Sequence, residues 1–278
     1  TAFALEAGAA GVVFPGFASE VDNLPAEERE TLLREIVKVV AGRVPVVAGA
    51  SAPSAEEAAD HARRAAELGI RHLMIQAPKS IGVDGGAVAA FYLAVSNAVP
   101  GIEIVLQNAP APRGSDLKPE VILDIVRGNP AITYVKEETL PSGGPISAIL
   151  KGAPPHLKGV LGGGGARYIV EEYVRGACGA MPAVEITDVH VALDRAFRAK
   201  DIAAARDLYR RTLPLLVIQA NFRMAFTKYV LTRRGLLSNH LCRAPVPALD
   251  ETDRAEIDAW LASVADLLAA PSAARKTG

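Results

Sequence analysis

Short apolar runs recur along the chain, and they predict the strands of a parallel sheet. The runs cover residues 11–14, 45–49, 72–76, 103–107, 132–136, 157–161 and 179–181. Each interval between two runs holds a segment in which apolar residues follow the helical period. Short strands that alternate with helices are typical of parallel sheets with crossover helices. The pattern therefore predicts an α/β fold.

Several helix boundaries are marked by capping residues. Ser54 stands where a helix should begin, and Glu57 follows three residues later, as in a capping box. Gly69 follows the last residue of that helical pattern, where a glycine with positive φ commonly ends a helix. Pro25 is expected in the first turn of the preceding helix, since it lacks the N–H that a first turn leaves unbonded.

Seven βα units are visible, and the chain begins inside a predicted helix at residues 1–8. We expect a further strand in a segment that precedes Thr1; it would make eight units, the number that closes a (β/α)₈ TIM barrel. From residue 201 the pattern predicts three helices, at 201–220, 222–233 and 251–269. We therefore expect a barrel at residues 1–200 and a C-terminal helical extension at 201–278.

Composition excludes several classes of function. Lys and Arg number 30 and Asp and Glu 31, so the chain lacks the basic excess typical of nucleic-acid binding. No segment has the roughly 20 consecutive apolar residues of a membrane helix. Cys178 and Cys242 lie far apart and form no disulfide framework, and the five histidines show no metal-ligand spacing. These features predict a cytoplasmic protein without a bound metal.

Lys136 is the first candidate for chemistry, because reacting groups of such barrels lie at the carboxyl ends of the strands. Strand alternation predicts that Ile132, Tyr134 and Lys136 face the barrel interior. Burial there favours the neutral amine, which is the nucleophile in imine formation. The alternative is an ion pair with Glu137 or Glu138 at the strand end.

Polar groups follow the neighbouring strand. Gln107 and Asn108 end that strand, and their amides can orient a carboxylate, a hydroxyl or a water; alternatively they bond to loop backbone. Arg113 can bind a substrate carboxylate in bidentate fashion, or it is solvated.

Two glycine-bearing segments complete the set of strand ends. Glycines 162–165 can expose backbone N–H groups to an anion, although they match no nucleotide-binding fingerprint, and a flexible loop is the alternative. Ser19 and Glu20 place a hydroxyl beside a carboxylate, which suits proton transfer. No histidine lies near them in sequence, so a Ser-His-Asp arrangement is not indicated.

Taken together, these motifs resemble the dihydrodipicolinate synthase / N-acetylneuraminate lyase family of class I aldolases over nearly the whole chain. The motifs are Gly16 to Glu20, Leu24-x-x-Glu27-Glu28-Arg29, Arg43 to Gly49, Asn108-x-Pro110, Val135-Lys136-Glu137, Gly176 to Met181 and Arg243-Ala244-Pro245. The resemblance implies an eight-stranded barrel with a C-terminal helical bundle, and a homotetramer built as a dimer of dimers. It also implies an imine with pyruvate or a similar 2-keto acid at Lys136. Gly163 and Met181 correspond to residues that contact the keto acid.

The chain departs from the family pattern in several places. It has Gly-Phe-Ala-Ser-Glu at 16–20 where synthases have Gly-Thr-Thr-Gly-Glu, and Gln107 where they have a proton-relaying tyrosine. Lys79 replaces another tyrosine, and the carboxylate-binding arginine is shifted to Arg113. Tyr134, two residues before the lysine, and the Gly-Ala-Met run at 179–181 are more similar to the branch that contains 2-keto-3-deoxyarabonate dehydratase.

The sequence therefore predicts a lyase that forms a Schiff base with a small 2-keto acid and needs no cofactor. A 2-keto-3-deoxy sugar acid dehydratase is the leading interpretation. A pyruvate-dependent aldolase similar to dihydrodipicolinate synthase, and a non-catalytic barrel that binds a keto acid, are the alternatives. The predicted catalytic residues are Lys136, Gln107 and Ser19. The predicted substrate-binding residues are Ala18, Asn108, Arg113, Tyr134, Gly163, Gly164 and Met181.

Overall fold

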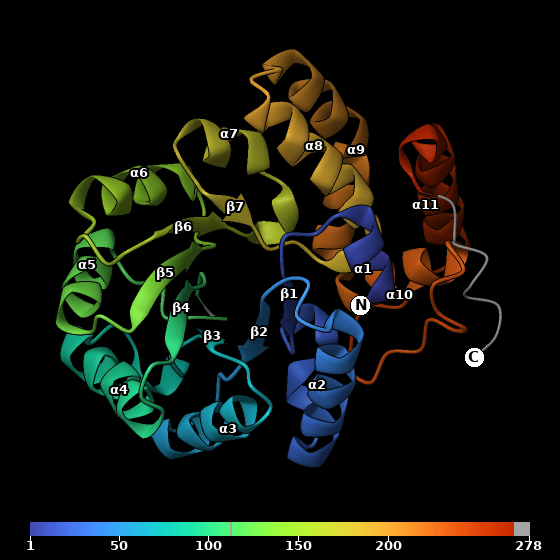
Figure 1. The fold of residues 1–278 in the computed structure, drawn as a ribbon. Helices are drawn as coiled ribbons and strands as arrows, with labels where there is room; N and C mark the ends of the chain where they lie inside the picture. The colour runs from blue at the N-terminus through green and yellow to red at the C-terminus, as the bar shows by residue number, and fades with distance from the viewer. Residues whose placement is uncertain (112, 270–278) are drawn as a thin grey trace.

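Seven parallel strands form one sheet in the order in which they occur along the chain. The structure is a computed structural model, and it describes residues 1–111 and 113–269. The strands are β1 (Val12–Phe14), β2 (Val46–Gly49), β3 (His72–Ile75), β4 (Glu103–Asn108), β5 (Ile132–Glu137), β6 (Gly159–Gly162) and β7 (Gly179–Ala180). Each predicted strand is found to within two residues. The sheet curves inside a ring of helices (Figure 1), which confirms the predicted α/β barrel class.

The first and last strands, β1 and β7, are the two edges of this sheet in the described residues. The predicted eighth strand would precede residue 1, so it stays a prediction.

The barrel helices follow the strands in regular alternation. They are α1 (Ala2–Ala7), α2 (Ala26–Val40), α3 (Ala55–Glu67), α4 (Gly85–Ala98), α5 (Pro119–Gly128), α6 (Gly143–Gly152), α7 (Ile169–Val174) and α8 (Thr187–Arg198). The predicted cap of α3 is confirmed, since Ser54 Oγ accepts a hydrogen bond from Glu57 N at 3.2 Å. Gly69 has φ +80° as predicted. Pro25 caps α2 one residue before its first turn.

Apolar side chains pack on both faces of the sheet. The larger core lies between the strands and the helices and includes Leu73, Ile104 and Val135. A smaller cluster fills the barrel interior; it consists of Val47, Met74 and Val105 with Val13, Tyr134, Leu161 and Met181 against them. The residues of the interior cluster line a cavity inside the barrel.

One predicted side-chain direction is wrong. Ile132 belongs to the helix-facing core, whereas Tyr134 belongs to the interior cluster. The register between β4 and β5 shifts at this point, because Ile104 pairs with Ile132 while Val105 pairs with Tyr134. The extra residue breaks the strict alternation of the strand. Tyr134 and the residues after it keep the predicted direction.

The C-terminal helices pack against the barrel. They are α9 (Ile202–Phe222), α10 (Met224–Arg233) and α11 (Glu251–Ser263). Helix α9 lies beside α8, and α10 and α11 pack against α9 (Figure 1). Ala205 and Leu216 of α9 share one core with Val189 and Leu193 of α8. This core crosses the predicted boundary at residue 201, so the helices are an extension that is continuous with the barrel core.

A buried carboxylate ties the C-terminal segment to the loop after β1. Glu20 forms an ion pair with Lys228 of α10. It also accepts hydrogen bonds from Arg243 N at 2.6 Å and Ala244 N at 2.8 Å. The loop after β1 and the C-terminal helices are therefore fixed to each other at the barrel mouth.

None of the helices in the described part of the chain combines the length and the apolar character needed to cross a membrane.

A second buried carboxylate, Glu172, lies on α7 behind β6. It accepts a hydrogen bond from Ser142 Oγ at 2.8 Å, while its Oε2 has no partner among the described residues. A Cβ atom at Gly162 would lie 2.0 Å from this oxygen, so the glycine leaves the space that Glu172 fills. Burial raises the pKa of Glu172 to about 7. The protonated form is the one that suits this site.

Replacing Glu172 with glutamine should remove a pH dependence of stability. The folded protein holds the Glu172 proton up to pH about 7, whereas the unfolded chain releases it near its usual value of 4.5. Between these values the unfolded state binds fewer protons, so the free energy of unfolding falls as pH rises. The loss amounts to about 3 kcal/mol by pH 8. Glu172→Gln should avoid it, so its urea midpoint should exceed that of wild type at pH 8 and match it near pH 4.5.

The control is Glu171→Gln, the exposed neighbour that pairs with Arg175. It should follow the wild-type pH dependence. Parallel curves for Glu172→Gln and wild type would contradict a buried proton at this position.

Candidate active site

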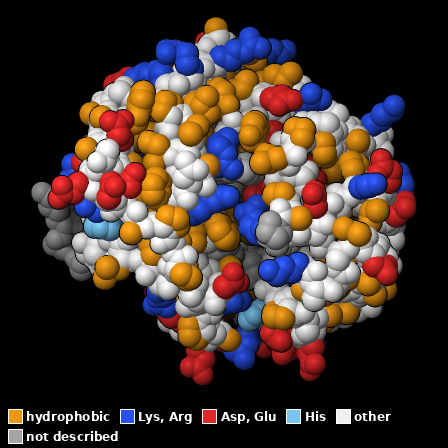
Figure 2. Space-filling view, turned by 180° about the vertical axis from the view of Figure 1, so that it is seen from behind, with side chains coloured by type: hydrophobic (Ala, Val, Ile, Leu, Met, Phe, Trp, Pro, Cys, Tyr) orange, Lys and Arg blue, Asp and Glu red, His pale blue; other side chains and the backbone are white. Residues whose placement is uncertain are grey.

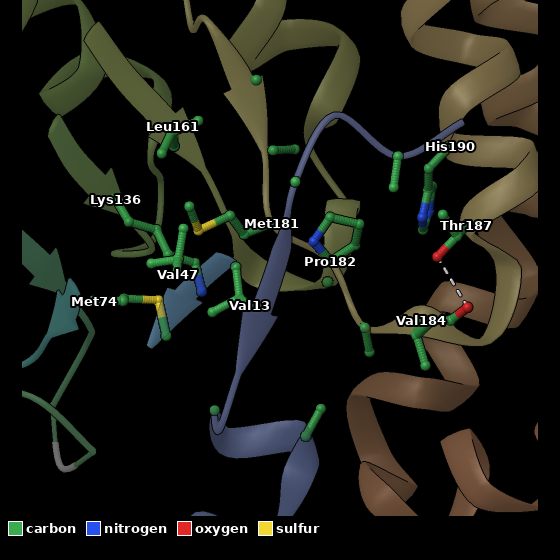
Figure 3. A pocket seen from close by; sticks show the side chains of 18 of the residues that line it. Val13, Val47, Met74, Lys136, Leu161, Met181, Pro182, Val184, Thr187 and His190 are labelled. Carbon is green, nitrogen blue, oxygen red and sulfur yellow. Dashed lines mark hydrogen bonds between the residues drawn. The ribbon is translucent and has the colours of Figure 1, made fainter. Parts of the chain in front are cut away.

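Lys136 is the last residue but one of β5, and its side chain lies in the barrel interior. Figure 3 shows it beside Val47, Met74 and Met181 of the interior cluster. The residue is 7% exposed, and it lines a cavity of about 1010 Å³. The predicted burial of the lysine is therefore present, and its amine faces a cavity that can admit a small molecule.

Glu138 is the partner of this lysine. Its Oε1 lies 3.4 Å from Lys136 Nζ and accepts a hydrogen bond from Gly164 N at 3.2 Å. Its Oε2 accepts one from Gln107 Nε2 at 2.5 Å and lies 3.6 Å from Arg113 Nη2. Four donors from two strands and two loops thus converge on one carboxylate.

The electrostatics of the cluster keep Glu138 ionised. Burial, the largest influence, would raise the pKa of Glu138. The charges of Lys136 and Arg113 and the bonds from Gln107 and Gly164 N–H outweigh it and lower the pKa to about 2. Burial of the lysine and its ion pair with a nearby carboxylate are therefore both present.

The adjacent Glu137 faces the opposite side of the sheet with Asn108. Asn108 Nδ2 donates to Glu137 Oε2 at 2.9 Å and to Leu117 O at 3.0 Å, and its Oδ1 accepts from Leu117 N at 2.9 Å. Asn108 is therefore a loop-fixing residue and does not line the cavity. The Asn108 side chain points away from the cavity because it follows Gln107, and successive side chains of a strand point to opposite faces. This orientation does not suit the predicted contact with substrate.

The glycine run makes room for side chains. A Cβ at Gly163 would lie 2.2 Å from Glu138 Cγ, and one at Gly165 would lie 2.4 Å from Gln219 Oε1. The N–H of Gly164, predicted to hold a substrate anion, is bonded to Glu138 instead. Gly163 itself is buried beneath Glu138 and is not among the residues that line the cavity, and its contact with the substrate stays a prediction.

The loop after β1 forms another part of the cavity wall. Phe17, Ala18 and Ser19 form a short 3-10 helix, η1 (Phe17–Ser19), and all three line the cavity. Ser19 Oγ accepts a hydrogen bond from Gly16 N at 3.4 Å. Glu20 is turned toward the C-terminal helices, so the Ser19–Glu20 pair suggested for proton transfer does not act as a unit.

Most predicted site residues do lie together. The predicted residues that line the cavity are Lys136, Gln107, Ser19, Ala18, Arg113, Tyr134, Gly164 and Met181. Figure 2 shows the face on which Lys and Arg side chains gather around a central hollow. No group of His, Cys, Asp and Glu within the described residues is suited to hold a metal ion.

Arg167 and Arg223, which the sequence did not single out, also line this cavity. Glu138 lines it too, although the sequence suggested it only as an alternative ion-pair partner of Lys136. Glu138 was foreseeable, because it lies two residues beyond Lys136 and alternation keeps both on one face. Arg167 and Arg223 follow no local motif and reach the cavity only through the fold.

The family comparison is decisive. The model of the "Dihydrodipicolinate synthetase family" matches residues 1–264. The chain belongs to this family. The resemblance inferred from the motifs is thereby confirmed, and the protein is a lyase of the class I aldolase superfamily.

Relatives within the dihydrodipicolinate synthetase family carry different names. A 4-hydroxy-tetrahydrodipicolinate synthase of Hyphomonas neptunium is 30% identical over 274 residues, covering 93% of this chain and 88% of the relative. An L-2-keto-3-deoxyarabonate dehydratase of Azospirillum brasilense is 29% identical over 261 residues, covering 92% and 83%. The similarity is nearly equal, so the choice of reaction depends on the residues of the site.

A solved structure agrees in fold. The dihydrodipicolinate synthase of Rhodopseudomonas palustris has a TM-score of 0.85 and 28% identity, with 94% of this chain and 88% of that chain covered.

Replacing Gly163 with alanine should displace Glu138. The new Cβ would lie 2.2 Å from Glu138 Cγ. Forcing the side chain aside should cost about 1–3 kcal/mol of stability, measured by thermal unfolding. Gly144→Ala is the matched control, because nothing lies within 4 Å of its added Cβ. In a Glu138→Ala background the cost of Gly163→Ala should shrink; an undiminished cost would contradict the proposed clash.

Proposed function

We propose that this lyase forms an imine between Lys136 and the C2 carbonyl of a short 2-keto acid, and that it dehydrates a 2-keto-3-deoxy sugar acid. The observation that carries the proposal is the buried pair of Lys136 Nζ and Glu138 Oε1, 3.4 Å apart at the cavity wall. Lys136 supplies the amine nucleophile, and the Glu138 carboxylate can accept the proton of its ammonium form.

Imine formation requires the ammonium to lose a proton. Glu138 is close enough to accept it, and the amine then attacks C2 to form a C–N bond. The carbonyl oxygen takes up one proton from the attacking nitrogen and the proton held by Glu138, and it leaves as water. Ammonium and ketone thus give a protonated imine and water with no net change in protons.

The protonated imine then acts as an electron sink for the C3–H bond. Loss of the C3 proton to Glu138 gives an enamine, and the enamine expels the C4 hydroxyl, which leaves as water with that proton. Glu138 is a weak base in the free protein. A substrate carboxylate at Arg113 would shield it from one of its two cations and raise its proton affinity.

Gln107 favours dehydration over aldol chemistry. Its amide does not exchange a proton near neutral pH, but its Nε2 holds Glu138 in place at 2.5 Å. An aldol step needs a proton relay to the aldehyde oxygen, and the tyrosine expected at this position is absent. Elimination needs only the one carboxylate beside C3 and C4.

The second candidate is a pyruvate-dependent aldolase similar to dihydrodipicolinate synthase. It is favoured by the Hyphomonas relative, whose name is that of a synthase. The exposed Phe17 and Ala18 would give an aldehyde an apolar wall. Ser19, which also lines the cavity, would then offer a hydroxyl to the incoming group.

Borohydride reduction should trap a keto acid on Lys136. Wild-type protein treated with pyruvate and borohydride should carry a covalent adduct on the Lys136 peptide, detected by mass spectrometry. Lys136→Ala should lose it. Lys158→Ala should retain it, because Lys158 is exposed and pairs with Glu103 at 2.7 Å. An adduct that persists in Lys136→Ala, or none in wild type, would reject the imine.

The products separate the candidate functions. A dehydrated keto acid formed from a 2-keto-3-deoxy acid supports the dehydratase, and pyruvate plus an aldehyde supports the aldolase. Ligand binding without either product would indicate the non-catalytic barrel.

Homotetrameric assembly, implied by the family, stays a prediction that light scattering tests.

Replacing Glu138 with glutamine should lower turnover by about 100- to 10,000-fold, the range for loss of a general acid–base group. Since the pKa of Glu138 is about 2, the wild-type carboxylate is ionised throughout the neutral range. The loss in kcat/KM should therefore be similar at pH 6 and pH 8. Glu171→Gln, on the exposed face of α7, should keep wild-type rates. A deficit confined to one end of the pH range would count against this role.

A further inference from the structure

Two arginines beyond Arg113 reach the cavity that contains Lys136. Arg167 follows the short 3-10 helix η4 (Gly164–Ala166), and Arg223 forms the junction between α9 and α10. Both line the cavity. Segments far apart in sequence thus bring a group of guanidinium ions to one place.

The cavity offers these arginines too little negative charge. Within the described ranges, the acidic side chains along its wall are Glu138 and Asp194. Asp194 pairs with Arg198 at 2.7 Å. Glu138 is already shared by Lys136 and Arg113, so the wall carries an excess of positive charge.

Arg167 and Arg223 form no ion pair within 4 Å among the described residues, and Arg167 Nη1 is buried without a hydrogen-bond partner. Burial, and then the charge of Arg113, lowers the pKa of Arg167. Burial lowers the pKa of Arg223 too, followed by the charges of Arg167 and Arg113. Half-buried cations that repel one another are unfavourable unless an anion joins them.

The side chains are held in place. The guanidinium carbons of Arg113 and Arg223 lie 5.3 and 5.6 Å from the centre of the Phe17 ring. Arg223 also has φ +50° and ψ −118°, a strained conformation for a residue with a Cβ atom. Strain of this kind concentrates at functional sites. The helix junction therefore directs Arg223 to this position at a cost to the fold.

We infer that Arg167 and Arg223 bind a second anionic group, a carboxylate or a phosphate, at the end of the substrate remote from the keto carbon. Planar guanidinium forks suit both groups in bidentate fashion. The substrate is then a doubly charged 2-keto acid. The inference rests on the proposed imine at Lys136 for the position of the keto end.

Matched substrates test the inference. Purified protein is given three 2-keto-3-deoxy acids of equal carbon chain length that end in a hydroxymethyl group, a carboxylate or a phosphate ester. Wild type should show kcat/KM about 100-fold higher for at least one dianion than for the neutral-ended acid. The preferred dianion identifies the anion.

Arg223→Met and Arg167→Met should each reduce this selectivity ratio by about tenfold or more. Arg210→Met, an exposed arginine paired with Asp207, should preserve it. The melting temperature of each variant without ligand distinguishes a binding role from a structural one. Removing a half-buried cation that lacks an ion pair should leave the melting temperature equal or higher, whereas loss of a structural residue would lower it.

The outcomes separate the two proposals. If pyruvate gives no borohydride adduct in wild type, the imine itself fails. If the adduct forms and wild type shows equal kcat/KM for all three acids, only the second anion site is overturned. Retention of the selectivity ratio in both arginine variants overturns it as well.

Discussion

The ion pair between Lys136 and Glu138 is the interaction on which the site depends. A buried ammonium without a counter-charge would be expelled or neutralised, and a buried carboxylate would be protonated. Together, 3.4 Å apart, each permits the burial of the other. The pair therefore contributes to the charge of the barrel mouth. It also places the ammonium proton, which must leave Lys136 before an imine forms, beside its acceptor Glu138.

The surrounding structure is arranged around that pair. The apolar interior cluster, with Met74 and Met181, lines the cavity beside it. Gly163 lets Glu138 approach the backbone, and Gln107 and Gly164 N–H fix the carboxylate from two sides. A glycine run that resembles an anion loop thus serves a protein carboxylate in the free state.

The C-terminal helices contribute to the site as well as to stability. Glu20 joins Lys228 to the loop after β1, and the same helices bring Arg223 over Phe17. The cavity is therefore closed by groups from both ends of the chain. Its excess of guanidinium charge distinguishes it from a site built for a singly charged keto acid.

Sequence alone determined the strands, the parallel sheet and Lys136 as the candidate nucleophile, because apolar periodicity and strand alternation are local properties. The family could also be inferred from the sequence, since each of its motifs is a short stretch of neighbouring residues. Where local rules fail, the reasons are physical. Ile132 turned outward because a register shift added a residue, and Asn108 follows Gln107 onto the other face.

The tertiary structure alone decided which side chains meet. The bond from Gly164 N–H to Glu138 and the convergence of Arg113 with Arg223 join segments separated by tens to more than a hundred residues. Charge balance in a cavity is a sum over such distant groups, so no local pattern reveals it.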